Sequence, residues 1–595
     1  MKKLLFLAAI AIGCSPKPAQ VDPNIAAIEN NLISYVHFED DSLWNIESRM
    51  KFYGVPGVSI AVIQDNKIVW SKAYGVMDKE TNEPVTTATL FQAGSISKPV
   101  AAYGALKTVE MGKANLNDDV NTFLTSWKIP DTEFTKDKKV TLEHLVSHTG
   151  GLTVHGFLGY SPDLPVPTLL QVLDGTAPAN SPPVRVDKEP GTGFRYSGGG
   201  YSVMQQMLID LHGKSFPEIE KELVLGPLKM DNSTYDQPLD SVTVKKAATG
   251  YLPNHEQTKG KRHTYPEMAA AGLWTTAEDL AKFAIDVQQT LKGESNKVLS
   301  QEMAKRMVTP VKNEDFIGLG LFMEDHEGDI YFGHGGWDEG FSSEMKAHRD
   351  KGYGIVVLTN SNHPQFIGEV MRSVARVYNW DHYATNYKKF PMDTSLFKTI
   401  SGRYRNGTDG GISIASKDGR LYFKYLRAND PSELYRISDS TYLTASNNAP
   451  VQFKLKADGQ VDMVVYEGKG ANVHDKLKDD EKVPYEYLVA GDYNKALKGY
   501  QALLKANPKD RSVEEDNLNM QGYEQLQSGK GKLAQDIFKI NTMLYPDSYN
   551  VYDSYGDACK ANGDTKEAIA SYRKALKLNH TSQETERKLA ELENK

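Results

Sequence analysis

Short apolar runs bounded by turn residues predict an antiparallel sheet in the first 390 residues. Residues 57–63 form a β-rich run, Asp65-Asn66 supplies turn residues, and residues 67–71 form a second run, so this segment predicts a β-hairpin. Further strands are expected at 329–332, 340–345 and 353–359, with His334-Gly335-Gly336-Trp337 between the first two. These segments place strands at both ends of this part of the chain.

Helical patterns fill the sequence between these strands. Helices are expected at 27–53, from Ala101, at 142–152 and at 201–212, and Thr276 with Asp279 resembles the capping box of another helix. Residues 160–190 are rich in proline and predict a long loop. Strands and helices together favour a mixed α+β domain over residues 27–388.

The pattern changes twice after residue 388. Short alternating runs over 393–480 predict a small all-β barrel or sandwich. Over 483–595, Ala496 and Tyr500 recur as Ala534 and Phe538 and again as Ala568 and Tyr572, which resembles tetratricopeptide repeats. Such repeats imply a groove for a protein or peptide partner, and a purely structural cap is the alternative.

Composition narrows the classes of function. A chain of 595 residues is too long for one core, and a net charge of -8 gives no indication of nucleic-acid binding. The two cysteines, Cys14 and Cys559, cannot form a disulfide framework or a cysteine-based zinc site. Cys559 occupies a core position of the last repeat and is expected to be an inert thiol.

The N-terminus predicts export. Residues 1–13 read as a signal peptide with a short apolar run, and Cys14 follows at once, as in a bacterial lipobox. Residues 14–26 would then be a tether to a lipid anchor, which would hold the protein at a membrane of the cell envelope, on its periplasmic or surface side. An ordinary signal peptide with an incidental cysteine is the alternative.

The stretch around Ser95 carries the candidate chemistry. Ser95 precedes a helix and Lys98 follows one turn later, so a hydroxyl nucleophile and a proton acceptor would share one face. Ser-x-x-Lys also occurs four more times, so the pattern alone is weak. The further occurrences begin at Ser48, Ser343, Ser395 and Ser571. Ser95 is distinguished from these by two glycine-rich segments downstream, Tyr196-Ser197-Gly198 and His334-Gly335-Gly336.

These three motifs, in this order, resemble the penicillin-recognising serine hydrolases related to class C β-lactamases. The resemblance implies an antiparallel sheet flanked by helices, a helical lobe, and a site between them without metal or organic cofactor. It implies an acylated nucleophile at Ser95, a cation at Lys98, a tyrosine base at Tyr196 and a strand position at His334. The backbone N–H groups of Ser95 and Trp337 would form the oxyanion hole, and Gly335 and Gly336 would let substrate lie against the strand.

Two departures from the family pattern narrow the expected reaction. Gly198 replaces the usual Asn, and His334-Gly335-Gly336 replaces Lys-Thr-Gly, which favours an esterase or peptidase over an efficient β-lactamase. We therefore expect a membrane-anchored serine hydrolase that cleaves an ester or an amide, including D-amino-acid or peptidoglycan-derived substrates. A non-catalytic envelope scaffold that uses the repeats is the alternative. His144 and His148 have metal-ligand spacing but no third ligand, so no metal site is expected.

Overall fold

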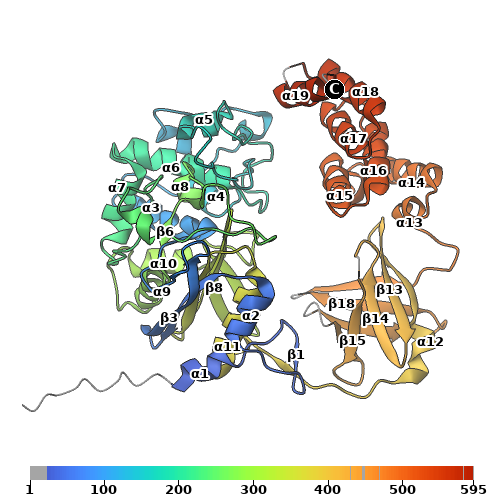
Figure 1. Ribbon diagram of the computed structural model, residues 1–595, viewed down its shortest axis with the longest axis horizontal. Helices are drawn as coiled ribbons and strands as arrows, with labels where there is room; N and C mark the ends of the chain where they lie inside the picture. The colour runs from blue at the N-terminus through green and yellow to red at the C-terminus, as the bar shows by residue number, and fades with distance from the viewer. Residues whose placement is uncertain (1–22, 429, 445–448, 468–469, 581, 594–595) are drawn as a thin grey trace, which may run out of the picture. The chain divides into compact units, whose positions relative to one another are not determined.

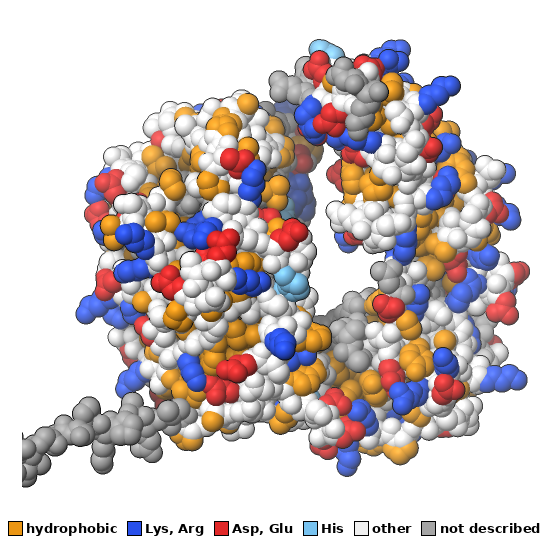
Figure 2. Space-filling view, in the orientation of Figure 1, with side chains coloured by type: hydrophobic (Ala, Val, Ile, Leu, Met, Phe, Trp, Pro, Cys, Tyr) orange, Lys and Arg blue, Asp and Glu red, His pale blue; other side chains and the backbone are white. Residues whose placement is uncertain are grey.

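A computed structural model describes residues 23–428, 430–444, 449–467, 470–580 and 582–593. The chain divides into two compact units (Figure 1). Residues up to Ser34 and from Asp41 to Thr385 form the first, and residues 35–40 and 386 onward form the second. On the face shown in Figure 2, acidic and basic side chains are interspersed over both units.

The first unit is built on a seven-stranded antiparallel sheet with the order β4-β3-β2-β10-β9-β8-β7. Its strands are β2 (Gly57–Gln64), β3 (Lys67–Asp78), β4 (Glu83–Pro84), β7 (Phe322–His326), β8 (Asp329–Asp338), β9 (Phe341–His348) and β10 (Gly354–Thr359). The predicted hairpin is β2–β3, and Asp65 and Asn66 both adopt positive φ, at 51° and 56°. Two such residues make the turn whose twist suits a hairpin.

The first unit also contains helices that pack on both faces of this sheet and on one another. They are α1 (Pro23–Glu29), α2 (Ile46–Tyr53), α3 (Ser97–Glu110), α4 (Leu142–Val146), α5 (Leu169–Asp174), α6 (Gly198–His212), α7 (Phe216–Glu220), α8 (Met268–Ala271), α9 (Ala277–Lys292), α10 (Gln301–Met307) and α11 (Pro364–Val377). Residues of α1, α2 and α11 form one hydrophobic cluster with the sheet, and residues of α3, α6 and α9 form the other. The predicted α+β class is confirmed.

Four local predictions were wrong. The helix expected at 142–152 ends at Val146. The expected helix at 27–53 is two helices, α1 and α2, because Asn45 caps α2 and residues 37–38 form strand β1 instead. The expected 160–190 loop contains α5, which begins at a capping box formed by Thr168 and Gln171. His334 to Trp337 do not lie between strands, since β8 continues through Asp338 and pairs with β9 over that length.

The second unit contains an eight-stranded antiparallel sheet, which confirms the predicted all-β region. Its strands are β12 (Gly402–Asn406), β13 (Gly410–Lys417), β14 (Arg420–Tyr425), β15 (Ser432–Arg436), β16 (Thr441–Thr444), β17 (Pro450–Leu455), β18 (Val461–Glu467) and β19 (Gly470–Asp475). A bridge between Tyr404 and Lys476 nearly closes the sheet into a barrel. Strand β1 (His37–Phe38) pairs with β11 (Asn386–Tyr387), and Phe38 packs near Leu443.

Helices that pack on one another in sequence complete the second unit. They are α13 (Pro484–Val489), α14 (Tyr493–Ala506), α15 (Glu515–Gln527), α16 (Gly531–Leu544), α17 (Tyr549–Ala561), α18 (Thr565–Leu578) and α19 (Gln583–Glu593), after the short α12 (Phe397–Ile400) that precedes the barrel. A Cβ at Gly522 would lie 2.5 Å from the Phe538 ring, and one at Gly556 would lie 2.5 Å from the Tyr572 ring. The recurring aromatic positions therefore pack against recurring glycines. Cys559 is fully buried, as expected.

Candidate active site

A tight turn holds Ser95 against strand β8. Ser95 lies in the 3-10 turn Gly94–Ile96, between β5 (Phe91–Gln92) and α3, and β5 pairs with β6 (Trp274–Thr275). Gly94 has φ +53°, and a Cβ there would lie 2.5 Å from the Trp337 backbone nitrogen. Only glycine allows both the positive φ and this close approach of two backbones.

Lys98 points from the first turn of α3 back to Ser95. Its Nζ lies 2.9 Å from the Ser95 Oγ and donates to the Ala270 carbonyl oxygen at 2.7 Å. The side chain is buried, and this desolvation lowers the pKa of Lys98 to about 7, against the opposing influence of Asp338. A lysine that is half neutral at pH 7 is able to accept the Ser95 proton.

Tyr196 completes a three-residue contact around Ser95. The Ser95 hydroxyl lies close enough to its phenol to act on the phenol's pKa, and the Lys98 Nζ lies 4.9 Å from its ring centroid. Burial raises the pKa of Tyr196 above its usual value, although the Ser95 contact opposes the shift. Tyr196 is therefore a proton donor at neutral pH. His148 stacks on its ring at 4.2 Å between centroids and holds it in place.

His334 lies on β8 beside this group, with its ring 6.1 Å from the Tyr196 ring. Burial, with the Lys98 charge as a smaller cause, lowers the pKa of His334 to about 3, so its imidazole is neutral. Its Nδ1 lies 2.6 Å from the Gly335 carbonyl oxygen and so carries the proton. The buried Nε2 is left as an acceptor with no hydrogen-bond partner in the described part of the chain.

Of the predicted oxyanion and substrate-binding residues, Gly335, Gly336 and Trp337 lie on β8, and Ser95 lies in the turn that packs against it. Gly336 must be glycine, because a Cβ there would lie 2.0 Å from the Ala93 carbonyl oxygen and 2.1 Å from the Ser343 Oγ. Gly335 has more room, with the Glu344 carboxylate 2.8 Å from its Cβ position. The structure thus brings together every predicted site residue except Cys14, which lies outside the described residues.

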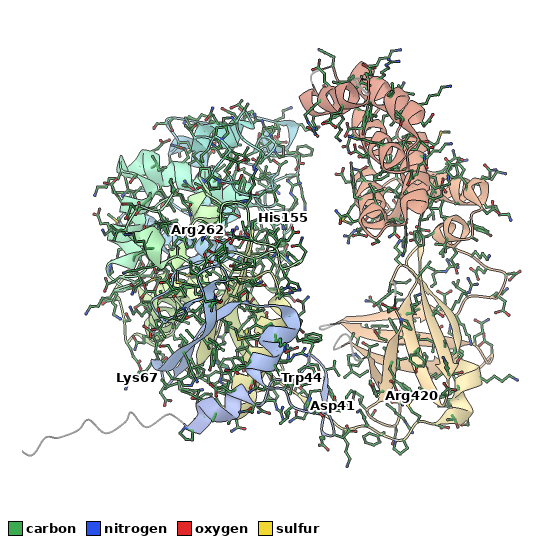
Figure 3. The ribbon with its side chains drawn as sticks, viewed as in Figure 1. Asp41, Trp44, Lys67, His155, Arg262 and Arg420 are labelled. Atoms are coloured by element: carbon green, nitrogen blue, oxygen red, sulfur yellow. The ribbon has the colours of Figure 1, made fainter. Side chains whose placement is uncertain are left out.

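A cavity of about 480 Å³ opens over Ser95. Residues from five separate segments line it: Ser95, Lys98, His155, Gly156, Phe157, Leu158, Tyr196, Ala270, Ala271, Trp337 and Asp338. No motif predicted that His155–Leu158 or Asp338 would lie here (His155 is labelled in Figure 3). Gly198 was the one available signal, since a missing side chain implies that something else fills its space.

Two buried acids belong to this region: Asp338, whose charge acts on Lys98, and Glu267, whose charge acts on Asp338. Asp338 lines the cavity, and Glu267 precedes α8, whose Ala270 binds the Lys98 Nζ. Their oxygens have no side-chain hydrogen-bond partner within the described residues. Desolvation raises the pKa of Glu267 to about 8, and desolvation likewise raises the pKa of Asp338, which the Lys98 charge opposes. Unpaired buried acids of this kind cluster at functional sites.

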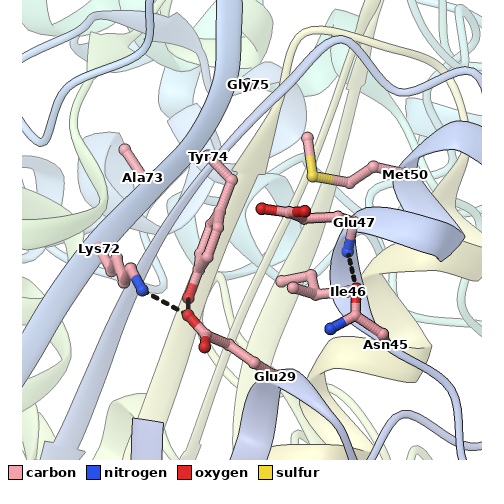
Figure 4. A pocket seen from close by; sticks show the side chains of 9 residues that line it. All are labelled: Glu29, Asn45, Ile46, Glu47, Met50, Lys72, Ala73, Tyr74 and Gly75. Atoms are coloured by element: carbon pink, nitrogen blue, oxygen red, sulfur yellow. Dashed lines mark hydrogen bonds and ion pairs between the residues drawn. The ribbon is translucent and has the colours of Figure 1, made fainter. Parts of the chain in front are cut away.

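A second cavity, of about 550 Å³, lies between α2 and β3 (Figure 4). Three of its titratable groups are paired with one another, since Glu29 accepts hydrogen bonds from both Lys72 and Tyr74. Asn45 and Glu47, which also line it, serve the N-terminus of α2. This cavity therefore shows the chemistry of a packed surface rather than of a reaction centre.

The histidines with metal-ligand spacing serve the backbone. The His144 Nδ1 accepts from the Thr141 N–H, and the His148 Nδ1 accepts from the Ser197 N–H. Across the described residues, no group of three or more His, Cys, Asp or Glu side chains is placed to hold a metal ion. A search of the same residues for a helix with the length and apolar character to cross a bilayer finds none.

Comparisons with known proteins agree with this geometry. A model of the family described as Beta-lactamase matches residues 45–378. Protein flp of Staphylococcus aureus (strain MW2) is 24% identical over 380 residues, 60% of this chain and 71% of that protein. The putative penicillin-binding protein PbpX of Bacillus subtilis (strain 168) is 25% identical over 349 residues, 56% of this chain and 78% of that protein.

One solved structure shows the same fold. The octameric penicillin-binding protein homologue from Pyrococcus abyssi superposes with a TM-score of 0.50 at 24% identity. The match covers 72% of this chain and 98% of that one. At this identity the likeness concerns the fold, and the reaction has to be argued from the residues around Ser95.

Proposed function

The chain belongs to the Beta-lactamase family, and on that premise we propose that it is a serine hydrolase acting through an acyl-enzyme on Ser95. The observation that carries the proposal is the contact between the Lys98 Nζ and the Ser95 Oγ, 2.9 Å apart at the mouth of a cavity. A nucleophile within hydrogen-bond reach of a base is the arrangement that acyl transfer requires. The substrate is an ester or an amide, D-amino-acid and peptidoglycan-derived compounds included.

In the proposed first step, neutral Lys98 takes the Ser95 proton as the Oγ attacks the substrate carbonyl. The lowered pKa of Lys98, about 7, supports this role. The family resemblance assigns the base to Tyr196, but burial raises the pKa of that phenol instead of lowering it. We therefore give Tyr196 the later step: it donates its proton to the leaving group and regains one from Lys98.

The developing oxyanion needs donors at the same place. The Ser95 turn and the Trp337 backbone nitrogen lie against each other, as the 2.5 Å approach at Gly94 shows. This supports the proposal that the N–H groups of Ser95 and Trp337 stabilise the oxyanion. Water then attacks the acyl-enzyme. Lys98 takes the water proton and returns it to the Ser95 Oγ as the bond between the acyl group and Oγ breaks and the acid is released.

The test is intact-mass spectrometry after incubation with a fluorophosphonate. Wild type is expected to gain one adduct, and Ser95→Ala none, while both show the same circular dichroism spectrum. Ser48→Ala is the matched control, because Ser48 has a lysine three residues later and lies exposed on α2. Labelling of Ser95→Ala, or no labelling of wild type, would refute the proposal and favour the non-catalytic scaffold.

Two further proposals concern the ends of the chain. We propose that a lipid on Cys14 anchors the protein to a membrane of the cell envelope; metabolic labelling with an alkynyl fatty acid, lost in Cys14→Ser, tests it. We also propose that the helices from α13 onward act as tetratricopeptide-like repeats for a protein or peptide partner. The packing of Gly522 and Gly556 against Phe538 and Tyr572 supports the repeat assignment.

A further inference from the structure

The loop from His155 to Leu158 fills the space that a side chain at position 198 would take. A Cβ at Gly198 would lie 3.0 Å from the Phe157 ring and 3.1 Å from the His155 carbonyl oxygen. The Gly198 and Gly199 N–H groups donate to the carbonyl oxygens of His155 and Val154 at 2.9 and 3.0 Å. The loop is therefore pinned to the first turn of α6, and Phe157 stands where a polar side chain would face the cavity.

The mouth of the same cavity carries exposed apolar side chains. Leu158 is 62% exposed and Trp337 is 48% exposed, and both line the cavity over Ser95. The Leu158 backbone is fixed, since its carbonyl oxygen is held by the His263 Nδ1 at 2.8 Å. Large apolar side chains that are exposed to water next to a reaction centre, on a backbone held in place, indicate a ligand that covers them.

The charged groups of the cavity leave no place for a substrate carboxylate. Of the described residues that line it, Lys98, His155, Tyr196 and Asp338 titrate, and the Tyr196 phenol is uncharged at pH 7 because burial raises its pKa. The Lys98 Nζ is already bonded to the Ser95 Oγ and the Ala270 oxygen. Burial lowers the pKa of His155, so it is neutral at pH 7. A bound carboxylate would lose its hydration and find no free cation in return.

We propose that the Ser95 cavity selects substrates with an uncharged, apolar acyl group larger than acetyl, which lies against Phe157, Leu158 and Trp337. The inference rests on the proposed acyl-enzyme chemistry and names its substrate class. Esters and amides of medium-chain or aryl-alkyl carboxylic acids fit it. Acyl groups that end in a carboxylate do not.

The test compares 4-nitrophenyl acetate, hexanoate and monoglutarate at one pH. Wild type is expected to show kcat/KM for hexanoate at least about tenfold above acetate and above the charged glutarate ester, since each buried methylene is worth roughly 10–200-fold. Leu158→Ala should lower the hexanoate-to-acetate ratio by about tenfold. Leu158 is largely exposed, so this variant keeps the fold. Phe157→Ala should lower the same ratio.

Leu164→Ala is the matched control. Leu164 is 50% exposed and lies a few residues further along the chain, but it does not line the cavity. The hexanoate-to-acetate ratio of kcat/KM in this variant should therefore equal that of wild type. Equal kcat/KM for acetate and hexanoate, or equal kcat/KM for the glutarate ester and hexanoate, would overturn the inference. The proposed function would still hold in that case if turnover depended on Ser95. Absence of turnover together with absence of a Ser95 adduct would overturn both.

Discussion

Buried acids occur in both units, and their surroundings differ. In the second unit, Asp409 is 2% exposed and accepts from the Arg427 Nη2 at 2.6 Å, the Tyr500 hydroxyl at 2.7 Å and the Tyr485 N–H at 2.7 Å. In the first unit, Asp338 and Glu267 are at least as deeply buried and have no side-chain hydrogen bond to any described residue. A buried acid whose oxygens are hydrogen-bonded stabilises the fold. A buried acid without such bonds costs stability, and groups of this kind are often found where they take part in a reaction.

Burial without a partner is not sufficient by itself. Glu220 is fully buried and unpaired within the described residues, and its carboxylate lies 2.3 Å from the Cβ position of Gly104 on α3. It does not line the cavity over Ser95. What distinguishes Asp338 from Glu220 is its place beside Lys98 and an opening to substrate. A buried acid without a hydrogen-bond partner therefore predicts a functional role only where it also lines a cavity.

The largest expected effect is on Lys98. Lys98→Met keeps the length of the side chain and removes the base, so ester turnover should fall about 10²–10⁴-fold. The free energy of unfolding should change by less than about 1 kcal/mol. The hydrogen bond to Ala270 is lost, but so is the desolvation cost of burying the Lys98 amine. Urea unfolding and kcat/KM measure the two quantities. Lys107→Met on the same helix is the control and should change neither.

A loss of more than about 2 kcal/mol in Lys98→Met with activity retained would make Lys98 a structural residue like Asp409. The comparison between the two units would then fail at its first site.

Asp409→Asn should show the opposite balance. The amide keeps the shape but weakens three hydrogen bonds, two of them to Arg427 and Tyr500, so the second unit should lose about 2–3 kcal/mol of stability. Ester turnover at Ser95 should stay at the wild-type value. Urea unfolding followed by tyrosine fluorescence measures the loss. Asp418→Asn, at an exposed turn, is the control, and an equal loss there would remove the distinction.

The sequence predicted the parts of this picture that depend on local spacing. Ser95 and Lys98 are one helical turn apart, and the structure places their side-chain atoms 2.9 Å apart. The β2–β3 hairpin follows from two apolar runs and the Asp65-Asn66 turn. Such features are set within a few residues, so a pattern of types is enough to find them.

What escaped prediction depends on segments far apart in the chain. Residues 37–38 form a strand because residues 386–387 pair with them, which no nearby pattern indicates. Likewise Phe157 enters the site only through its packing on Gly198. The direction of the pKa shift at Tyr196 also depends on burial, which the motif does not encode.

The smallest expected effect is a change in the pH dependence of turnover. It distinguishes Lys98 from Tyr196 as the base. If Lys98 is the base, kcat/KM for an uncharged ester should rise about tenfold per unit below pH 7 and level off above it, since the lysine is active when neutral and its pKa is about 7. Burial lowers the pKa values of His148, His155 and His334, so each imidazole takes up its proton at a lower pH than a free histidine does.

A tyrosine base gives a different curve. The pKa of Tyr196 is raised by burial, so turnover that depended on its ionised form would still be rising above pH 9. Asp338→Asn sharpens the test, because Asp338 raises the pKa of Lys98 and its neutral replacement should move the midpoint to lower pH. A midpoint that stays fixed in this variant would mean that the unpaired acid of the first unit does not influence the base beside it.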